Sequence, residues 1–110
     1  MLLKNDNMTD DSKDFPKTVA QAVKRLKREL PLEDKGNIKD MQEDDLSGLH
    51  ISLGVYIRNE FGLWSGNNEL MESCRSVSGV DELHVDSAST VIISELWRQL
   101  QKMPDLKIVK

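Results

Sequence analysis

The chain has 110 residues, of which 38% are hydrophobic and 31% are charged, and its net charge is −4. This composition is typical of one small soluble domain with a single core and argues against general binding of polyanions. No apolar run approaches the roughly 20 residues of a membrane-spanning helix. The first residues lack the apolar segment of a secretory signal, and the single cysteine excludes an intrachain disulfide. Together these features predict a cytoplasmic protein.

The polar residues 1–14 predict a disordered leader, and residues 15–110 then predict a single domain. Thr18 and Gln21 have the spacing of a capping box, which predicts a helix beginning just after Thr18 and stopping near Pro31. Its apolar residues recur at helical spacing, namely Val19, Ala22, Val23, Leu26 and Leu30. A short, weak helix is expected over residues 32–41.

A longer helix is predicted from about Glu43 to Phe61, with Gly62 as the residue that ends it. Its second half belongs to the least polar stretch of the chain, residues 49–67, so we expect this helix to be buried at the centre of the fold. On a helical wheel Glu60 falls on the apolar face. Ile51 and Val55 fall on the opposite face of the wheel. This predicts that other parts of the protein pack against the helix from more than one side. Gly54 would allow close approach of a neighbouring helix or of a ligand.

Two further helices complete the predicted fold. Asn67 is a good N-cap for a helix that ends near Gly79, and Asp86 or Ser87 caps a last helix that ends at Pro104. The first of these helices is expected to bury Leu70, Met71, Cys74 and Val77, and the last to bury Ala88, Val91, Ile92, Leu96, Leu100 and Met103. Because no alternating run suits a strand, the sequence predicts an all-α domain. We expect an irregular bundle of four main helices and one short helix around the buried central helix.

Three polar residues, His50, Arg58 and Glu60, interrupt the least polar stretch and need partners if they are buried. Arg58 and Glu60 are two residues apart, so they cannot pair with each other along one helix. We expect Arg58 to contact an acidic loop or a carbonyl at a helix C-terminus. We expect Glu60 to contact the N-terminus of another helix. These bonds would fix the fold. Alternatively, His50, Arg58, Glu60 and His84 would line one pocket that binds a ligand. His84 and Asp86 are too few for a zinc site, and we predict no metal, cofactor or catalytic residue.

The first predicted helix has a basic side made of Lys17, Lys24, Arg25, Lys27 and Arg28. Such a side can bind an acidic partner or nucleic acid, but no aromatic residues for base stacking accompany it, so nucleic acid is the less favoured partner. Trp64 and Trp97 are expected to be large core residues. If Trp64 is exposed, it becomes a candidate contact residue in the loop that leads to Asn67.

The segment Ile57–Trp64 (IRNEFGLW), with Leu49-His50 before it and Gly66-Asn67 after it, resembles an uncharacterised family of small bacterial proteins, a domain of unknown function. The resemblance extends to Phe15-Pro16-Lys17-Thr18, Ser73-Cys74, His84, Asp86, Ala88-Ser89 and Leu96-Trp97. Val85 and Ser87 depart from the pattern, which weakens a ligand role for that loop. The resemblance implies a bacterial, cytoplasmic protein and assigns no activity.

The sequence alone is therefore compatible with three functions. The leading hypothesis is a non-enzymatic module that binds another protein through the first helix and the loop at residues 63–67. The alternative is a small-ligand-binding protein or an enzyme that uses the pocket of His50, Arg58, Glu60 and His84. The third is nucleic-acid binding through the basic first helix. The oligomeric state is not predicted.

Overall fold

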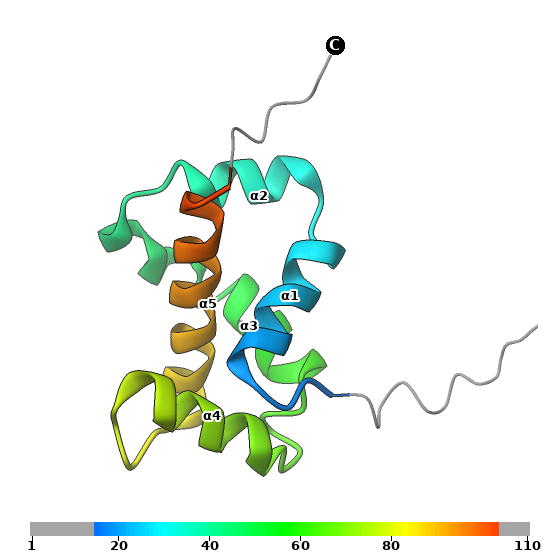
Figure 1. The fold of residues 1–110 in the computed structure, drawn as a ribbon, viewed down its shortest axis with the longest axis vertical. Coiled ribbons are helices and arrows are strands. Elements are labelled where there is room, and N and C mark those ends of the chain that lie inside the picture. Colours follow the sequence, from blue (N-terminus) through cyan, green and yellow to red (C-terminus); the bar gives the residue numbers. More distant parts are fainter. Residues whose placement is uncertain (1–14, 104–110) are drawn as a thin grey trace, which may run out of the picture.

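The computed structural model describes residues 15–103, which form six helices and no strand (Figure 1). In chain order they are α1 (Val19–Glu29), α2 (Leu32–Lys39), the 3₁₀-helix η2 (Glu43–Leu49), α3 (Leu53–Glu60), α4 (Asn68–Ser78) and α5 (Val85–Gln101). The all-α prediction is confirmed. The predicted leader, residues 1–14, lies outside the described residues. None of the described helices is long and apolar enough to cross a membrane.

Helix α1 begins as its sequence predicts. The Thr18 hydroxyl accepts a hydrogen bond from the Gln21 backbone N–H at 3.0 Å. The Gln21 side chain accepts from the N–H of Lys17 at 2.9 Å, one residue before the partner that a capping box would use. The predicted apolar residues of α1 are buried, namely Val19, Ala22, Val23 and Leu26.

The predicted central helix is two helices, so the expectation of one continuous helix is wrong. The 3₁₀-helix η2 ends at Leu49, and α3 begins at Leu53 after a turn. Gly48 and the neighbouring serines lower helix propensity here, and the three-residue period of a 3₁₀-helix places Leu46 and Leu49 on one side. The break turns Ile51 outward, where it is 80% exposed. Val55 is also exposed. No described helix therefore packs over the side with Ile51 and Val55, where we expected a neighbour.

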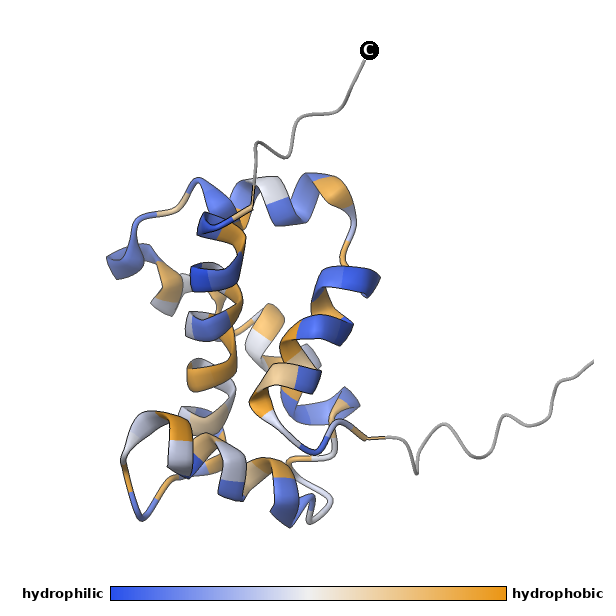
Figure 2. Ribbon diagram, viewed as in Figure 1, coloured by the Kyte–Doolittle hydropathy of each residue, from blue (hydrophilic) through white to orange (hydrophobic). Residues whose placement is uncertain are grey.

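The helix at the centre of the described fold is α5, not the predicted one, because all five other helices pack against it. Figure 1 shows α5 passing between α1 on one side and η2 on the other. Its buried residues are Ala88, Ser89, Ile92, Ile93, Leu96 and Leu100. Figure 2 shows that the outer turns of α1 and α2 are largely hydrophilic. Helix α1 is amphipathic, and its buried residues join those of the other described helices in one core.

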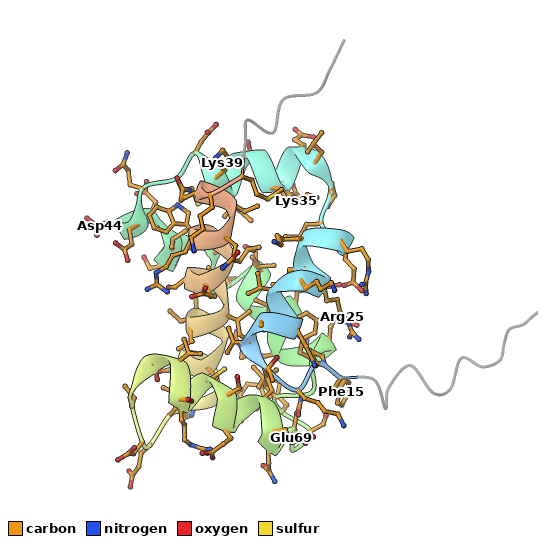
Figure 3. All side chains as sticks on the ribbon, viewed as in Figure 1. Phe15, Arg25, Lys35, Lys39, Asp44 and Glu69 are labelled. Atoms are coloured by element: carbon orange, nitrogen blue, oxygen red, sulfur yellow. The ribbon has the colours of Figure 1, made fainter. Side chains whose placement is uncertain are left out.

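Residues of α2 and of the turn after it form hydrogen bonds with the C-terminal half of α5 and the residues just after it. Lys39, labelled in Figure 3, donates to the carbonyl oxygens of Leu100 and Met103 at 2.9 and 3.1 Å. A lysine is well suited to these positions because the last carbonyls of a helix lack partners and carry partial negative charge. Trp97 is partly buried, and its indole N–H donates to the Met41 carbonyl oxygen at 2.9 Å. Trp97 therefore belongs to the core, as predicted.

Two of the other helix ends lie at the glycines that the sequence predicted, and one helix has a different N-cap from the predicted one. Gly62 has a φ of +74° after α3, and the Leu63 N–H donates to the Arg58 carbonyl at 3.1 Å, the bond of a Schellman motif. Gly79 ends α4 with a φ of +76°. Helix α5 is capped by His84, whose Nδ1 accepts from the Asp86 N–H at 3.1 Å. The predicted caps, Asp86 and Ser87, lie inside the first turn instead.

Candidate functional site

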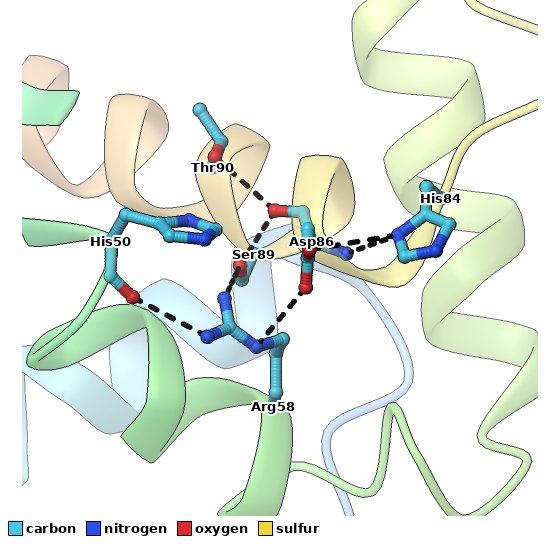
Figure 4. A network of polar contacts seen from close by, with 6 residues as sticks. All are labelled: His50, Arg58, His84, Asp86, Ser89 and Thr90. Atoms are coloured by element: carbon cyan, nitrogen blue, oxygen red, sulfur yellow. Dashed lines mark hydrogen bonds and ion pairs between the residues drawn. The ribbon is translucent and has the colours of Figure 1, made fainter.

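Among residues 15–103, Arg58 is the buried charged residue, with 6% of its surface exposed. Its Nη1 donates to the Ser89 hydroxyl at 2.9 Å, and its Nη2 donates to the His50 carbonyl oxygen at 3.4 Å. Its Nε lies 3.5 Å from a carboxylate oxygen of Asp86. We call Arg58, His50, Asp86, Ser89 and His84 the Arg58 cluster (Figure 4). It joins the end of η2 to α3 and to the first turn of α5.

The break between η2 and α3 supplies one of these partners. His50 is the C-cap of η2. A carbonyl oxygen at a helix C-terminus receives no hydrogen bond from within the helix, so it is free to accept one from Arg58. Gly54 supplies the space, because a Cβ there would lie 2.9 Å from Nη1 of Arg58. The guanidinium thus folds back over the glycine one turn before it. Gly54 makes room for a side chain of its own helix, and not for the neighbouring helix or ligand that we expected.

Ser89 is a member of the cluster that sequence reasoning missed. It is fully buried, accepts from Arg58, and donates to the Asp86 carbonyl oxygen at 2.8 Å. A signal was present, because Ser89 stands three and four residues before Ile92 and Ile93 on a helical stripe. A serine hydroxyl in such a stripe costs free energy unless it is hydrogen-bonded.

Three of the four residues of the predicted pocket, Arg58, His50 and His84, belong to the Arg58 cluster, and Glu60 does not. Arg58 meets both an acidic residue and a C-terminal carbonyl, as expected, and His50 joins it through its backbone. His84 is a largely exposed cap, with Nδ1 3.9 Å from the Asp86 carboxylate. Glu60 is exposed, so its predicted place on an apolar face is wrong. The cluster's polar bonds end on the chain itself, which is the arrangement of a structural tie between helices.

Trp64 and Asn67, the two candidates in the loop after α3, have opposite surroundings. Trp64 is 59% exposed, so its predicted role as a core residue is wrong. Asn67 is the predicted N-cap, since its side-chain oxygen accepts from the Leu70 N–H at 3.3 Å. Its amide nitrogen donates to the carbonyl oxygens of Pro16 and Phe61, both at 2.8 Å. Asn67 therefore ties three segments together, and Trp64 is the residue of the pair that can meet a partner.

The predicted basic side of α1 divides into two groups. Lys17 lies 3.7 Å from a carboxylate oxygen of Glu69, and the guanidinium of Arg25 lies over the Phe61 ring at 5.6 Å from its centre. Arg25 and Glu69 are labelled in Figure 3. The other three, Lys24, Lys27 and Arg28, form no ion pair with any described residue. Lys24 and Lys27 line a groove, and Lys24 also lines a smaller pocket with Arg25 and Arg28.

This groove, which we call the α1 groove, runs between α1, α4 and α5 and has a volume of about 530 Å³. Its apolar residues come from α1 and α4, and are Val19, Ala20, Val23 and Val77. Val77 is 49% exposed, so its predicted burial on α4 is wrong. Beneath the groove, the Ser73 hydroxyl accepts from the Val19 N–H at 2.9 Å and fixes α4 to the start of α1.

The two walls of the α1 groove differ in charge. On the α5 wall, both carboxylate oxygens of Glu95 are engaged, one by Arg98 at 2.9 Å and the other by the Gln99 amide at 3.2 Å. On the α1 wall, Lys24 and Lys27 form no ion pair with any residue between 15 and 103. The groove therefore combines an apolar floor with a positively charged edge.

A second groove of about 420 Å³ lies between α2 and α3 and includes Ile38, Leu49, Leu53 and Tyr56. The Tyr56 hydroxyl donates to the Glu29 carboxylate at 2.8 Å. Partial burial and this bonded carboxylate raise the pKa of Tyr56 to about 12.

Residues 15–100 match the family model described as Domain of unknown function (DUF6794). No curated protein and no solved structure matches the chain. Among residues 15–103, no group of three or more His, Cys, Asp or Glu side chains is placed to hold a metal ion.

Proposed function

We propose a function from geometry alone, because the chain belongs to the DUF6794 family, whose model is that of a domain of unknown function. The protein acts as a module that binds another protein, and the α1 groove is its main contact surface. The observation that carries this proposal is the apolar groove of about 530 Å³ with unpaired lysines on one edge. An apolar surface edged by polar groups is typical of a protein–protein interaction site.

Two observations favour protein binding over the alternatives. The guanidinium of Arg58, the anion-binding group of the predicted ligand pocket, is already engaged by the chain's own acceptors. Nucleic-acid binding is disfavoured by the net charge of −4 and by α1 itself, which carries no aromatic residue for base stacking.

The proposal is tested with two matched valine substitutions on the surface of the purified, tagged protein. Val77 lines the α1 groove and is 49% exposed, and Val80 is 46% exposed and is not among the groove residues. Val77→Glu places a charge on the apolar floor and is expected to reduce partner capture at least tenfold. Val80→Glu is expected to capture the same proteins as the original chain. Quantitative mass spectrometry after affinity purification measures both.

Circular dichroism establishes that both variants stay folded, which exposed positions of this kind permit. Equal capture by both variants and the original chain would refute the groove as the contact surface. Retention of RNA or DNA at low salt, lost when Lys24, Arg25 and Arg28 are all replaced by Glu, would favour nucleic-acid binding instead.

We further propose that Trp64 adds a second contact and that the protein works in a bacterial cytoplasm. An exposed tryptophan is a typical hot-spot residue of interfaces. The cytoplasm is supported by the single, fully buried cysteine, which needs no oxidising compartment. Unchanged partner capture by a folded Trp64→Ala variant would remove Trp64 from the interface.

A further inference from the structure

We infer that the occupant of the α1 groove is an amphipathic helix of a partner protein that carries acidic residues along one edge. The inference rests on the proposed function, because it names the kind of partner that this groove binds. Both the shape of the groove and the distribution of charge along it support this choice.

The shape favours a helix because the groove follows the two helices that form its walls. Val19, Val23 and Lys27 recur every four residues along α1, and Glu95 and Gln99 do the same along α5. The span from Val19 to Lys27 corresponds to about 12 Å of helix, roughly two turns. A helix that lies along such a groove presents apolar residues at positions i, i+3 or i+4, and i+7.

The charge favours acidic residues on the edge that faces α1. Lys24 and Lys27 are three residues apart, so both follow the same edge of the groove at the spacing of one helical turn. Glu95 on the opposite wall is already paired with Arg98, and so it offers little attraction to a basic partner. Carboxylates three or four residues apart on the partner would therefore meet the two lysines, and a lysine-rich helix would be repelled.

A photo-crosslinking residue at Ala20 tests this inference in the full-length protein. Ala20 is exposed and lines the groove, and the matched control carries the same photoreactive residue at Asn59, which is exposed on α3. After irradiation in a lysate of the source organism, the crosslinked peptides are sequenced. We expect the Ala20 peptides, but not the Asn59 peptides, to be amphipathic helical segments with acidic residues three or four positions apart.

A synthetic copy of the most enriched peptide then provides a defined probe. Its affinity for the protein is expected to fall at least tenfold with Lys24→Glu/Lys27→Glu and to recover partly when the peptide's acidic residues are changed to lysine. A Lys102→Glu variant, exposed beyond the end of α5, serves as the charge control and is expected to bind like the original chain.

The outcomes separate this inference from the proposed function. If Ala20 crosslinks no protein more than Asn59 does, the proposed function itself fails. If Ala20 crosslinks partner segments that are basic or lack acidic residues, the proposed function stands and the inference is wrong. Crosslinks to a second copy of this chain, or to its own acidic residues 1–14, would also overturn the inference.

Discussion

At the scale of single residues, the burial of Arg58 depends on a set of partners that come from two other helices, η2 and α5. Moving a charge out of water costs several kcal/mol, which must be offset by an opposite charge and by hydrogen bonds. The Asp86 carboxylate, the Ser89 hydroxyl and the His50 carbonyl supply them. The geometry also needs a residue without a side chain one turn earlier, and Gly54 provides it.

The two helical glycines of α2 and α3 should respond in opposite directions to the same substitution. Gly36→Ala is expected to raise the free energy of unfolding by about 1 kcal/mol, because alanine has the higher helix propensity and a Cβ there meets nothing within 4 Å. Gly54→Ala displaces the Arg58 guanidinium from Ser89 and forfeits about 1.5–3 kcal/mol of a charged hydrogen bond. It should therefore lower the free energy of unfolding by about 1 kcal/mol. Urea denaturation measures both values.

The control for Gly54 is the Arg58→Leu background. Without the guanidinium, Gly54→Ala should become stabilising, as Gly36→Ala is in the original chain. A destabilising effect of Gly54→Ala that persists in this background would show that the glycine serves another neighbour.

At this scale the sequence predicted which residues are unusual but not which atoms they meet. Arg58 was expected to find a carboxylate or a carbonyl, and it finds both. His50 was expected to act through its ring, but it acts through its backbone, because the break after η2 frees its carbonyl. Whether a helix continues or breaks at such a point depends on the packing of η2 against α5, which no local pattern contains.

At the scale of elements, the helix ends carry much of the specificity of this fold. Thr18, Asn67 and His84 each accept a backbone N–H at the start of a helix. Local patterns predicted the first two because Thr and Asn are common N-caps. Histidine is not a common cap, and the sequence therefore placed the N-cap of α5 at Asp86 or Ser87, two or three residues too late.

Asn67 allows the cap to be separated from the contacts between segments. Asn67→Asp keeps an oxygen for the Leu70 N–H and loses both bonds from the amide nitrogen to Pro16 and Phe61. We expect it to lower the free energy of unfolding by about 2 kcal/mol, at about 1 kcal/mol for each hydrogen bond. Asn67→Ala should cost about 1 kcal/mol more, because it also removes the cap.

Thermal and urea unfolding followed by circular dichroism measure the Asn67 series. As a control, Thr18→Ala removes a cap alone and should cost about 1 kcal/mol. If Asn67→Asp were as stable as the original chain, the two amide bonds would contribute nothing, and Asn67 would be only a cap.

At the scale of the whole molecule, one helix organises the core. Every other described helix packs against α5, and its buried residues extend from Ala88 to Leu100. The sequence pointed to the predicted helix from about Glu43 to Phe61, because its second half lies in the least polar stretch, residues 49–67. Hydrophobicity indicates that a segment is buried, but not that it lies at the centre of the fold. Ile51 and Trp64 raise the apolar content of the stretch while lying largely in solvent.

Cys74 reports whether this core opens as one unit. The thiol is fully buried between α4 and α5, its Sγ lies 3.6 Å from the Ala88 carbonyl oxygen, and burial raises its pKa to about 11. We expect a thiol reagent at pH 8 to label it only through unfolding. Gly54→Ala, although it lies in α3, should then speed labelling about fivefold for each kcal/mol of lost stability.

Labelling in concentrated urea should be fast and equal for the two proteins, which controls for the chemistry of the thiol. A native labelling rate that Gly54→Ala leaves unchanged would mean that α4 opens locally, without the rest of the core.

The place of α5 after the five helices that pack against it also determines when these helices can fold during synthesis. Helices α1 to α4 are made first, but the apolar surface that each of them covers belongs to residues 88–100. Until those residues leave the ribosome, the apolar residues of the earlier helices have no common partner to pack against. The nascent chain is therefore committed to folding late, as one unit, and its exposed apolar faces are those that a chaperone would recognise.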